Sequence, residues 1–162
     1  MNWTENGSQV SLYADYTFTV NGNRNLVANF SYAPFPPAPT GAIRGLFTVG
    51  AGKQVWFSQG NLQYKPSSSQ WQFAEQQYTL LHNSSSDLTN EYQAGYNGWI
   101  DLFGWATSGY NGKMPYMTST TDTDYGDGSS PVAGTQYDWG VLNAISNGGN
   151  QTGIWRTLTK DE

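Results

Sequence analysis

Short alternating runs of apolar residues, each bounded by turn residues, are the feature that most restricts the fold of this chain. The pattern recurs at residues 16–20 (YTFTV), 26–30 (LVANF), 55–57, 62–64 and 71–73. A period of two predicts half-buried β-strands. The segments between the runs are rich in Gly, Asn, Ser and Pro, which favour turns and loops. We therefore expect a mainly β fold (β-rich α+β) of short antiparallel strands and long loops.

The first thirty residues are expected to form a partial β-repeat, 1–30. The turn-forming sequence NGNRN at 21–25 separates the runs at 16–20 and 26–30 and predicts a hairpin. A third short strand is expected at 10–12. Three short strands are marginally stable alone, so this unit should pack on other structure or belong to a larger repeat.

The segment 31–43, SYAPFPPAPTGAI, holds four prolines and predicts a semi-rigid linker. A Pro-rich loop within a single domain is the alternative. The remainder, 44–162, is expected to form a β-rich domain. Its runs at 62–64 and 71–73 should be joined by the turn KPSSSQ, and a further run ends at 78–81.

Helical spacing occurs near the C-terminal end of the sequence. Residues 138–147, DWGVLNAISN, predict one short helix, with Asp138 as its N-cap. Residues 154–158 follow as a predicted strand. Thr159 and Glu162 have the spacing of a capping box, which marks the start of a helix. We therefore expect the domain to be incomplete at its C-terminus; a tail with chance spacing is the alternative.

The composition restricts both the partners and the chemistry. The net charge is −5, and the seven Lys and Arg residues are scattered singly, which excludes the clustered cationic footprint of a nucleic-acid-binding protein. The absence of Cys excludes disulfides, thiol nucleophiles and Cys-ligated zinc. No apolar run in this segment approaches the roughly 20 residues of a membrane span. The opening MNWTENGSQ is polar, so any export signal is expected upstream of it.

Residues 2–30 resemble part of a known bacterial repeat. The opening NWTENG, the segment YTFTV and the ending NRNLVANF are similar to the C-terminal part of InlB B-type (Listeria–Bacteroides) repeats. These repeats occur in bacterial surface proteins. The resemblance covers part of one repeat and implies that its first strands would lie before Met1.

Residues 45–162 resemble a domain of secreted and surface proteins of gut Bacteroidetes. The resemblance rests on GLFTVGAGKQVWFSQGNLQY, WQFAEQQY, GWIDLFGWATSGYNG, YDWGVLNAISNGGN and WRTLTKDE. The later part of that family is distantly similar to C-type-lectin-like and formylglycine-generating-enzyme-like folds. Formylglycine chemistry does not carry over, because its cysteines are absent here. The resemblance implies an extracellular or cell-surface protein with adhesive or ligand-binding work, and it names no catalytic residue.

Aromatic residues on turn-rich segments are the candidate ligand contacts. Between residues 96 and 112 the chain reads YNGWIDLFGWATSGYNG, in which Trp99–Phe103 is expected to be a buried anchor and Gly104–Gly112 an exposed loop. Trp and Tyr present a large apolar face with a polar handle, and they serve equally well in cores. The candidate ligand-binding residues are Trp105, Tyr110, Tyr116 and Tyr125. Trp56, Trp71, Trp139 and Trp155 lie in strand or helix patterns and are expected in the core.

An acidic loop, TDTDYGDG, suggests calcium as the one candidate cofactor. Asp122, Asp124 and Asp127 supply the oxygen ligands that Ca²⁺ prefers, although the spacing is not that of an EF-hand. A solvated, Asp-rich loop is the alternative.

Catalysis has weaker support in the sequence. Two facing carboxylates could hydrolyse a glycoside, and Asp101, flanked by apolar residues, is the leading candidate beside Asp138, Glu75 and Glu91. The alternative is that Asp101 caps a turn or pairs with Arg156. His82, the single histidine, stands in a polar loop with no sign of a nucleophile.

Three functional hypotheses remain at this point. The first is a non-catalytic surface or secreted module that binds glycan or extracellular protein. The second is a fragment of a glycan-acting hydrolase, and the third is a structural stalk or spacer. Two carboxylates that face each other in one cleft would favour the hydrolase. Exposed aromatic residues without such a pair would favour the binding module. Fully buried aromatic residues would favour the stalk or spacer.

Overall fold

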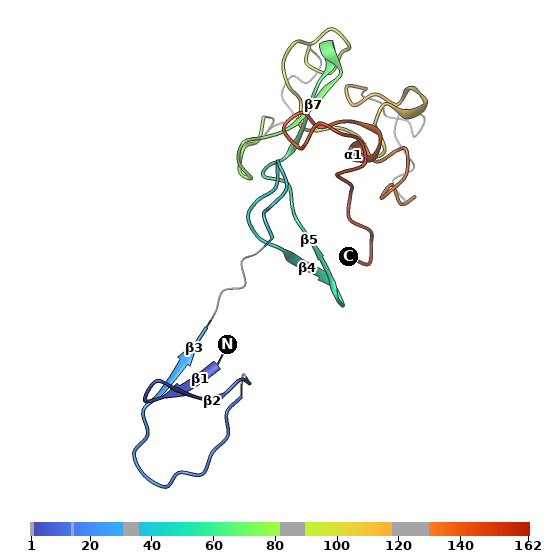
Figure 1. Ribbon diagram of the computed structural model, residues 1–162. Coiled ribbons are helices and arrows are strands. Elements are labelled where there is room, and N and C mark those ends of the chain that lie inside the picture. Colours follow the sequence, from blue (N-terminus) through green and yellow to red (C-terminus); the bar gives the residue numbers. More distant parts are fainter. Residues whose placement is uncertain (1, 14, 31–35, 82–89, 118–129) are drawn as a thin grey trace. The chain divides into compact units, whose positions relative to one another are not determined.

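The computed structural model describes residues 2–13, 15–30, 36–81, 90–117 and 130–162. The chain divides into two compact units, Met1–Pro36 and Pro37–Glu162 (Figure 1). Short antiparallel strands dominate both units, so the mainly β fold with one short helix is confirmed. Within the described ranges no helix is long and apolar enough to cross a membrane.

Unit 1 (Met1–Pro36) is a three-stranded antiparallel sheet in the order β2–β1–β3. The strands β1 (Asn2–Glu5) and β2 (Ser8–Ser11) form a hairpin. Its turn is Asn6–Gly7, whose φ angles of 51° and 79° are the positive values that a tight two-residue hairpin loop requires. The third strand, β3 (Leu26–Asn29), lies along the other edge of β1, which confirms the strand expected at 26–30.

The strand and hairpin predicted for residues 16–25 are wrong. Residues 16–20 form no strand, although Tyr16 and Phe18 are half-buried and their neighbours exposed, as the alternation requires. Arg24 holds this segment instead: its guanidinium lies 4.5 Å from the centre of the Phe18 ring and 5.7 Å from that of Tyr16. It also forms a two-pronged ion pair with Glu5, with N···O distances of 2.9 and 2.5 Å. The alternating side chains of residues 16–20 therefore pack in a cluster around Arg24 and do not belong to a β-strand.

In the described part of unit 2 (Pro37–Glu162) the strands form two separate hairpins. The first pairs β4 (Phe47–Gly50) with β5 (Lys53–Val55). The second pairs β6 (Leu62–Lys65) with β7 (Gln70–Phe73) through the 3₁₀ turn η1 (Pro66–Ser68), as the turn KPSSSQ predicts. The strands expected at 78–81 and 154–158 are not formed.

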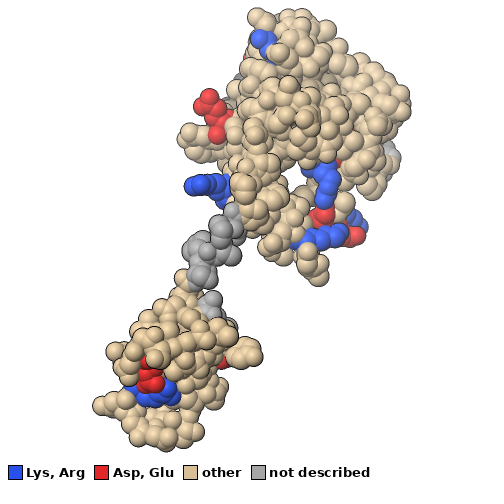
Figure 2. Space-filling view, viewed as in Figure 1, with Lys and Arg blue, Asp and Glu red and all other residues tan. Residues whose placement is uncertain are grey.

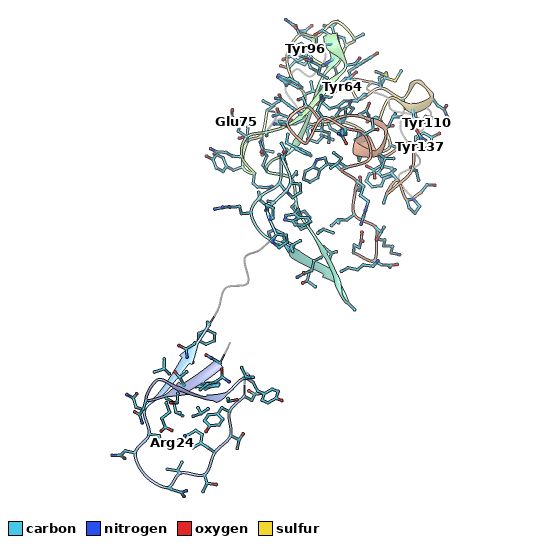
Figure 3. The ribbon with its side chains drawn as sticks, viewed as in Figure 1. Arg24, Tyr64, Glu75, Tyr96, Tyr110 and Tyr137 are labelled. Atoms are coloured by element: carbon cyan, nitrogen blue, oxygen red, sulfur yellow. The ribbon has the colours of Figure 1, made fainter. Side chains whose placement is uncertain are left out.

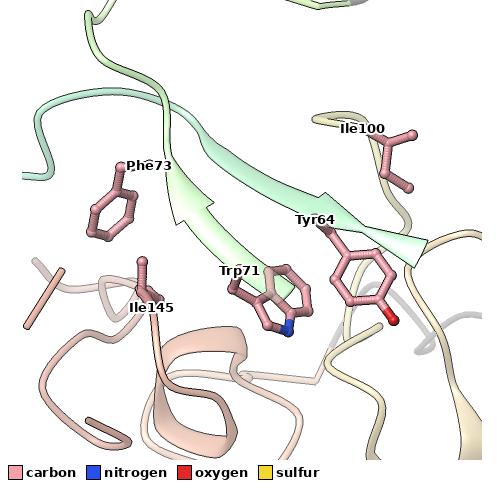
Figure 4. Packing of buried hydrophobic residues seen from close by; sticks show 5 residues of the cluster. All are labelled: Tyr64, Trp71, Phe73, Ile100 and Ile145. Carbon is pink, nitrogen blue, oxygen red and sulfur yellow. The ribbon is translucent and has the colours of Figure 1, made fainter. Parts of the chain in front are cut away.

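The core of unit 2 is a cluster of five buried residues around β6 and β7: Tyr64, Trp71, Phe73, Ile100 and Ile145 (Figure 4). The rings of Tyr64 and Trp71 pack with their centres 4.6 Å apart. Ile100 is fully buried and exchanges two backbone hydrogen bonds of 2.8 Å with Tyr64. The buried anchor expected at Trp99–Phe103 is therefore confirmed at Ile100, whereas Leu102 is 49% exposed.

The helix α1 (Trp139–Leu142) is shorter than the predicted 138–147. Asn143 leaves the helix with extended φ and ψ, and its side chain donates to Trp139 O at 3.0 Å. The chain then turns to lie along β7, where Ile145 forms a parallel bridge with Trp71. Burial of Ile145 against the sheet outweighs the helical spacing of the sequence, because tertiary packing routinely overrides local propensity.

Candidate ligand-binding site

A cavity of about 450 Å³ lies within unit 2 and is the candidate functional site. Its walls come from four places: β5 with the residues that follow it, the end of β7, the region of α1, and residues 154–158. Five aromatic residues line it: Trp56, Phe57, Phe73, Trp139 and Trp155. The volume falls within the range of small-molecule sites, which are mostly apolar with a few placed polar groups.

Aromatic packing shapes the cavity wall. The rings of Phe73 and Trp155 meet edge to face with centres 4.7 Å apart. The Trp155 indole nitrogen donates to Gly148 O at 2.8 Å, which fixes the ring. Gly140 allows the close approach of Trp155, because a Cβ at Gly140 would lie 2.5 Å from the Trp155 carbonyl oxygen.

Asp138 is a buried carboxylate in the lining of the cavity, with 1% of its surface exposed. It stands at the N-cap position of α1, as predicted, but its side chain forms no capping bond. Its oxygens accept instead from Gly134 N (3.0 Å), Thr157 N (2.9 Å) and Thr157 Oγ1 (3.1 Å). Asp138 therefore joins the loop before α1 to the segment that forms one wall.

Arg156 lines the cavity and carries a bidentate ion pair with Glu162, with N···O distances of 2.7 and 2.8 Å. The Arg156 guanidinium is the main cause that lowers the pKa of Glu162 to about 2, and the Thr159 N–H adds to the effect. That N–H donates to Glu162 Oε2 at 3.0 Å, which is one of the two bonds of the predicted capping box. Lys53, at the start of β5, lies 3.9 Å from Glu162 and links the hairpin to this segment.

Asp101 does not contribute to this cavity. Its Oδ2 accepts from Leu81 N at 2.7 Å, which joins two segments 20 residues apart; this bond is not the turn cap that is one of the two roles expected for it. The other expected role, a pair with Arg156, is not formed, because Arg156 is paired with Glu162.

Trp105 and Tyr110 are among the exposed large apolar residues, at 39% and 37%. The segment Gly104–Gly112 is nevertheless not an exposed loop throughout, because residues 106–108 at its centre are buried. Trp105 packs edge to face on Trp139, with ring centres 5.9 Å apart, and its indole donates to Ser130 O at 3.1 Å. The sequence signal missed here is the small size of residues 106–108, which lets the chain pass through the interior.

Tyr110 forms a pair with Tyr137 at the edge of unit 2 (Figure 3). Their ring centres lie 5.0 Å apart with planes at 89°. Asn111 donates to the Tyr137 hydroxyl at 3.1 Å, so one aromatic pair and one amide meet on the surface.

Tyr116 is half-buried and packs on the core residue Tyr64, with ring centres 6.4 Å apart. Three further groups lie outside the described residues: the candidate contact Tyr125, the candidate calcium ligands Asp122, Asp124 and Asp127, and His82. Across the described ranges no group of three or more His, Cys, Asp or Glu could hold a metal ion.

The cavity was missed from the sequence because its aromatic residues lie in regular patterns. The sequence predicts Trp56, Trp139 and Trp155 in the core. Trp139 and Trp155 do pack against the core cluster, but all three are half-buried and line the cavity. Trp71, by contrast, is 4% exposed and is a core residue, as predicted. No protein-family model, curated protein or solved structure gives a significant match to the chain.

Proposed function

We propose that this protein is a non-catalytic module, secreted or held at the cell surface, that binds glycan or an extracellular protein through the cavity of unit 2. The observation that carries the proposal is the aromatic lining of this cavity, interrupted by a few polar side chains. Such a combination gives a ligand apolar contact area and fixes its orientation through hydrogen bonds.

The carboxylates of the site support binding over hydrolysis. A glycosidase places two carboxyl groups about 5–10 Å apart across the scissile bond. Among the described residues, Asp138 is the sole carboxylate that lines the cavity. Both of its oxygens already accept hydrogen bonds from the protein, so it is a structural group here.

The open cavity also supports binding over a purely structural role. A stalk or spacer gains stability by burying its apolar side chains, whereas this cavity opens to solvent and leaves part of its apolar lining accessible. The exposed Trp105 and the Tyr110–Tyr137 pair add aromatic surface outside the cavity. A ligand-binding role accounts for both features.

The test is a binding screen of the intact chain against a glycan array and a panel of extracellular-matrix proteins. Titration of each hit is then followed by tryptophan fluorescence. Substitution of Trp56→Ala in the cavity should reduce affinity for the hit by about tenfold or more, because it removes a large contact face. The matched control is Tyr78→Ala, which removes an aromatic ring that is 80% exposed and does not line the cavity. Equal loss with both variants, or no hit on either panel, would contradict the proposal.

A further inference from the structure

The charged groups of the cavity already have hydrogen-bonding partners within the protein. Among the described lining residues, Asp138 and Arg156 are the charged ones. Asp138 accepts three hydrogen bonds, and Arg156 is paired with Glu162 at both terminal nitrogens. A charged ligand that entered would lose its hydration without gaining a free counter-charge, which is costly. The site therefore favours an uncharged ligand.

The hydroxyl groups of two lining residues have already used their protons. Ser58 Oγ donates its proton to Gly60 O at 2.9 Å, and Thr157 Oγ1 donates to Asp138 at 3.1 Å. A hydroxyl has one proton and two lone pairs, so each oxygen can serve a ligand only as an acceptor. A ligand that matches them must bring its own donors, and a purely apolar ligand would leave these acceptors unpaired.

The chain as a whole is poor in charge, with 12% charged residues. On the face shown in Figure 2 the charged side chains of unit 2 are few, and acidic and basic groups gather together at its lower right. A volume of about 450 Å³ admits a small molecule or the end of a chain. A protein face, by comparison, buries about 800 Å² on each partner.

We infer that the cavity binds the end of a neutral saccharide, with one or two rings stacked on its aromatic walls. The C–H face of a sugar ring packs against flat aromatic side chains such as Trp56 and Trp155. Its hydroxyl groups supply the donors that Ser58 and Thr157 can accept. Gln54, exposed at the start of the wall, adds an amide that can both donate and accept. This inference rests on the binding role proposed above and names its ligand class.

The test uses the full chain and three kinds of probe. The first is a set of neutral methyl glycosides and disaccharides, and the second is the matching uronic acids. The third is an apolar dye, Nile red. Binding is followed by calorimetry and by tryptophan fluorescence. We expect the neutral sugars to bind and the uronic acids to bind at least about tenfold more weakly.

Substitutions test the hydroxyl contact, and urea unfolding of each variant measures any accompanying loss of structure. Thr157→Val should lower the affinity for the neutral sugar by about tenfold, and Thr157→Ser, which keeps the hydroxyl, should restore that affinity. Ser58→Ala should also lower the affinity. Thr152→Val, in an exposed turn away from the cavity lining, is the control and should change nothing.

The outcomes distinguish this inference from the proposed function. Uronic acids that bind as tightly as neutral sugars overturn the neutral specificity. Nile red or a protein ligand that occupies the cavity when no saccharide does overturns the inference and leaves the binding role in place. If Trp56→Ala weakens the binding of no saccharide, dye or protein ligand, both this inference and the proposed function are overturned.

Discussion

The carboxylate of Asp138 holds Thr157 by two hydrogen bonds, 2.9 Å from its backbone N–H and 3.1 Å from its hydroxyl. The two residues are 19 positions apart, and Asp138 is 1% exposed. A buried acceptor that serves backbone donors ties together segments that no strand ladder joins. Asp138 is therefore one of the side chains that hold the wall formed by residues 154–158.

Replacement of Asp138 by Asn should lower the free energy of unfolding by about 1–3 kcal/mol, because one amide oxygen replaces two acceptor oxygens and a buried donor loses its partner. Urea unfolding followed by tryptophan fluorescence measures the change. Asp161→Asn, at an exposed position, is the control and should stay within about 0.5 kcal/mol of the wild type. Equal effects of the two variants would show that Asp138 does not hold the wall.

Glu162 should make the stability of unit 2 depend on pH below about 4.5. Its pKa is lowered from 4.5 to about 2, chiefly by Arg156, so the folded state favours the ionised form. The stabilisation is complete above pH 4.5 and is lost as the pH falls toward 2. Urea midpoints of the wild type and of Glu162→Gln should thus differ at pH 6 and converge near pH 2. A difference that persists at low pH would contradict this pairing.

Gly140→Ala should destabilise unit 2 by about 1–3 kcal/mol, since the added methyl group overpacks the contact with Trp155. Its Cβ would lie 2.5 Å from the Trp155 carbonyl oxygen and 2.7 Å from the Trp155 Cβ. A loss of stability would be informative, because replacing Gly by Ala within a helix ordinarily raises the stability. Thermal unfolding measures the effect. Gly95→Ala, where the methyl group meets open space, is the matched control and should cause little change.

Trp71→Ala should cost about 3–5 kcal/mol of stability, the range for loss of a large buried aromatic side chain. Trp71 is 4% exposed and packs on both Tyr64 and Phe103. Chemical unfolding measures the loss. Tyr78→Ala removes an aromatic ring that is 80% exposed and should be nearly neutral, so similar costs at both positions would rule out the core described here.

Arg24→Lys should loosen unit 1 without changing unit 2. Lys cannot reproduce the two-pronged bond to Glu5 or the planar contact with Phe18. Amide hydrogen exchange of β1 and β3 should become faster, and more so at low salt, where the wild-type pair is least screened. If the amide hydrogen exchange of β1 and β3 stays unchanged, the contacts of Arg24 with Glu5 and Phe18 do not stabilise unit 1.

The sequence predicts the hairpin β6–β7 because every signal it needs is local. Two alternating runs flank a turn, and the turn contains Pro66 at a position that accepts it. Residues 16–20 show the same alternation and form no strand, because a strand also needs a partner edge, which the alternation cannot reveal. The Asn6–Gly7 pair carries a strong hairpin signal, but the flanking NWTE and SQVS lack a clear apolar alternation.

The candidate site was harder to predict than the fold for a physical reason. Local sequence separates turns from regular elements, so it finds exposed aromatics such as Trp105 and Tyr110. It does not separate an aromatic side chain that fills a core from one that lines a cavity. Trp71 and Trp155 differ in this respect only because distant segments cover the first and leave the second half-exposed.

The side chain of Asn147 acts on β7 as a substitute for a neighbouring peptide group. Its Oδ1 accepts from Phe73 N at 2.7 Å and its Nδ2 donates to Phe73 O at 2.8 Å. Ser146 N, one residue earlier, donates to Trp71 O at 2.9 Å. The outer edge of this two-stranded sheet is therefore closed to strands of other molecules, which protects a weakly charged, aromatic-rich chain from edge-to-edge association.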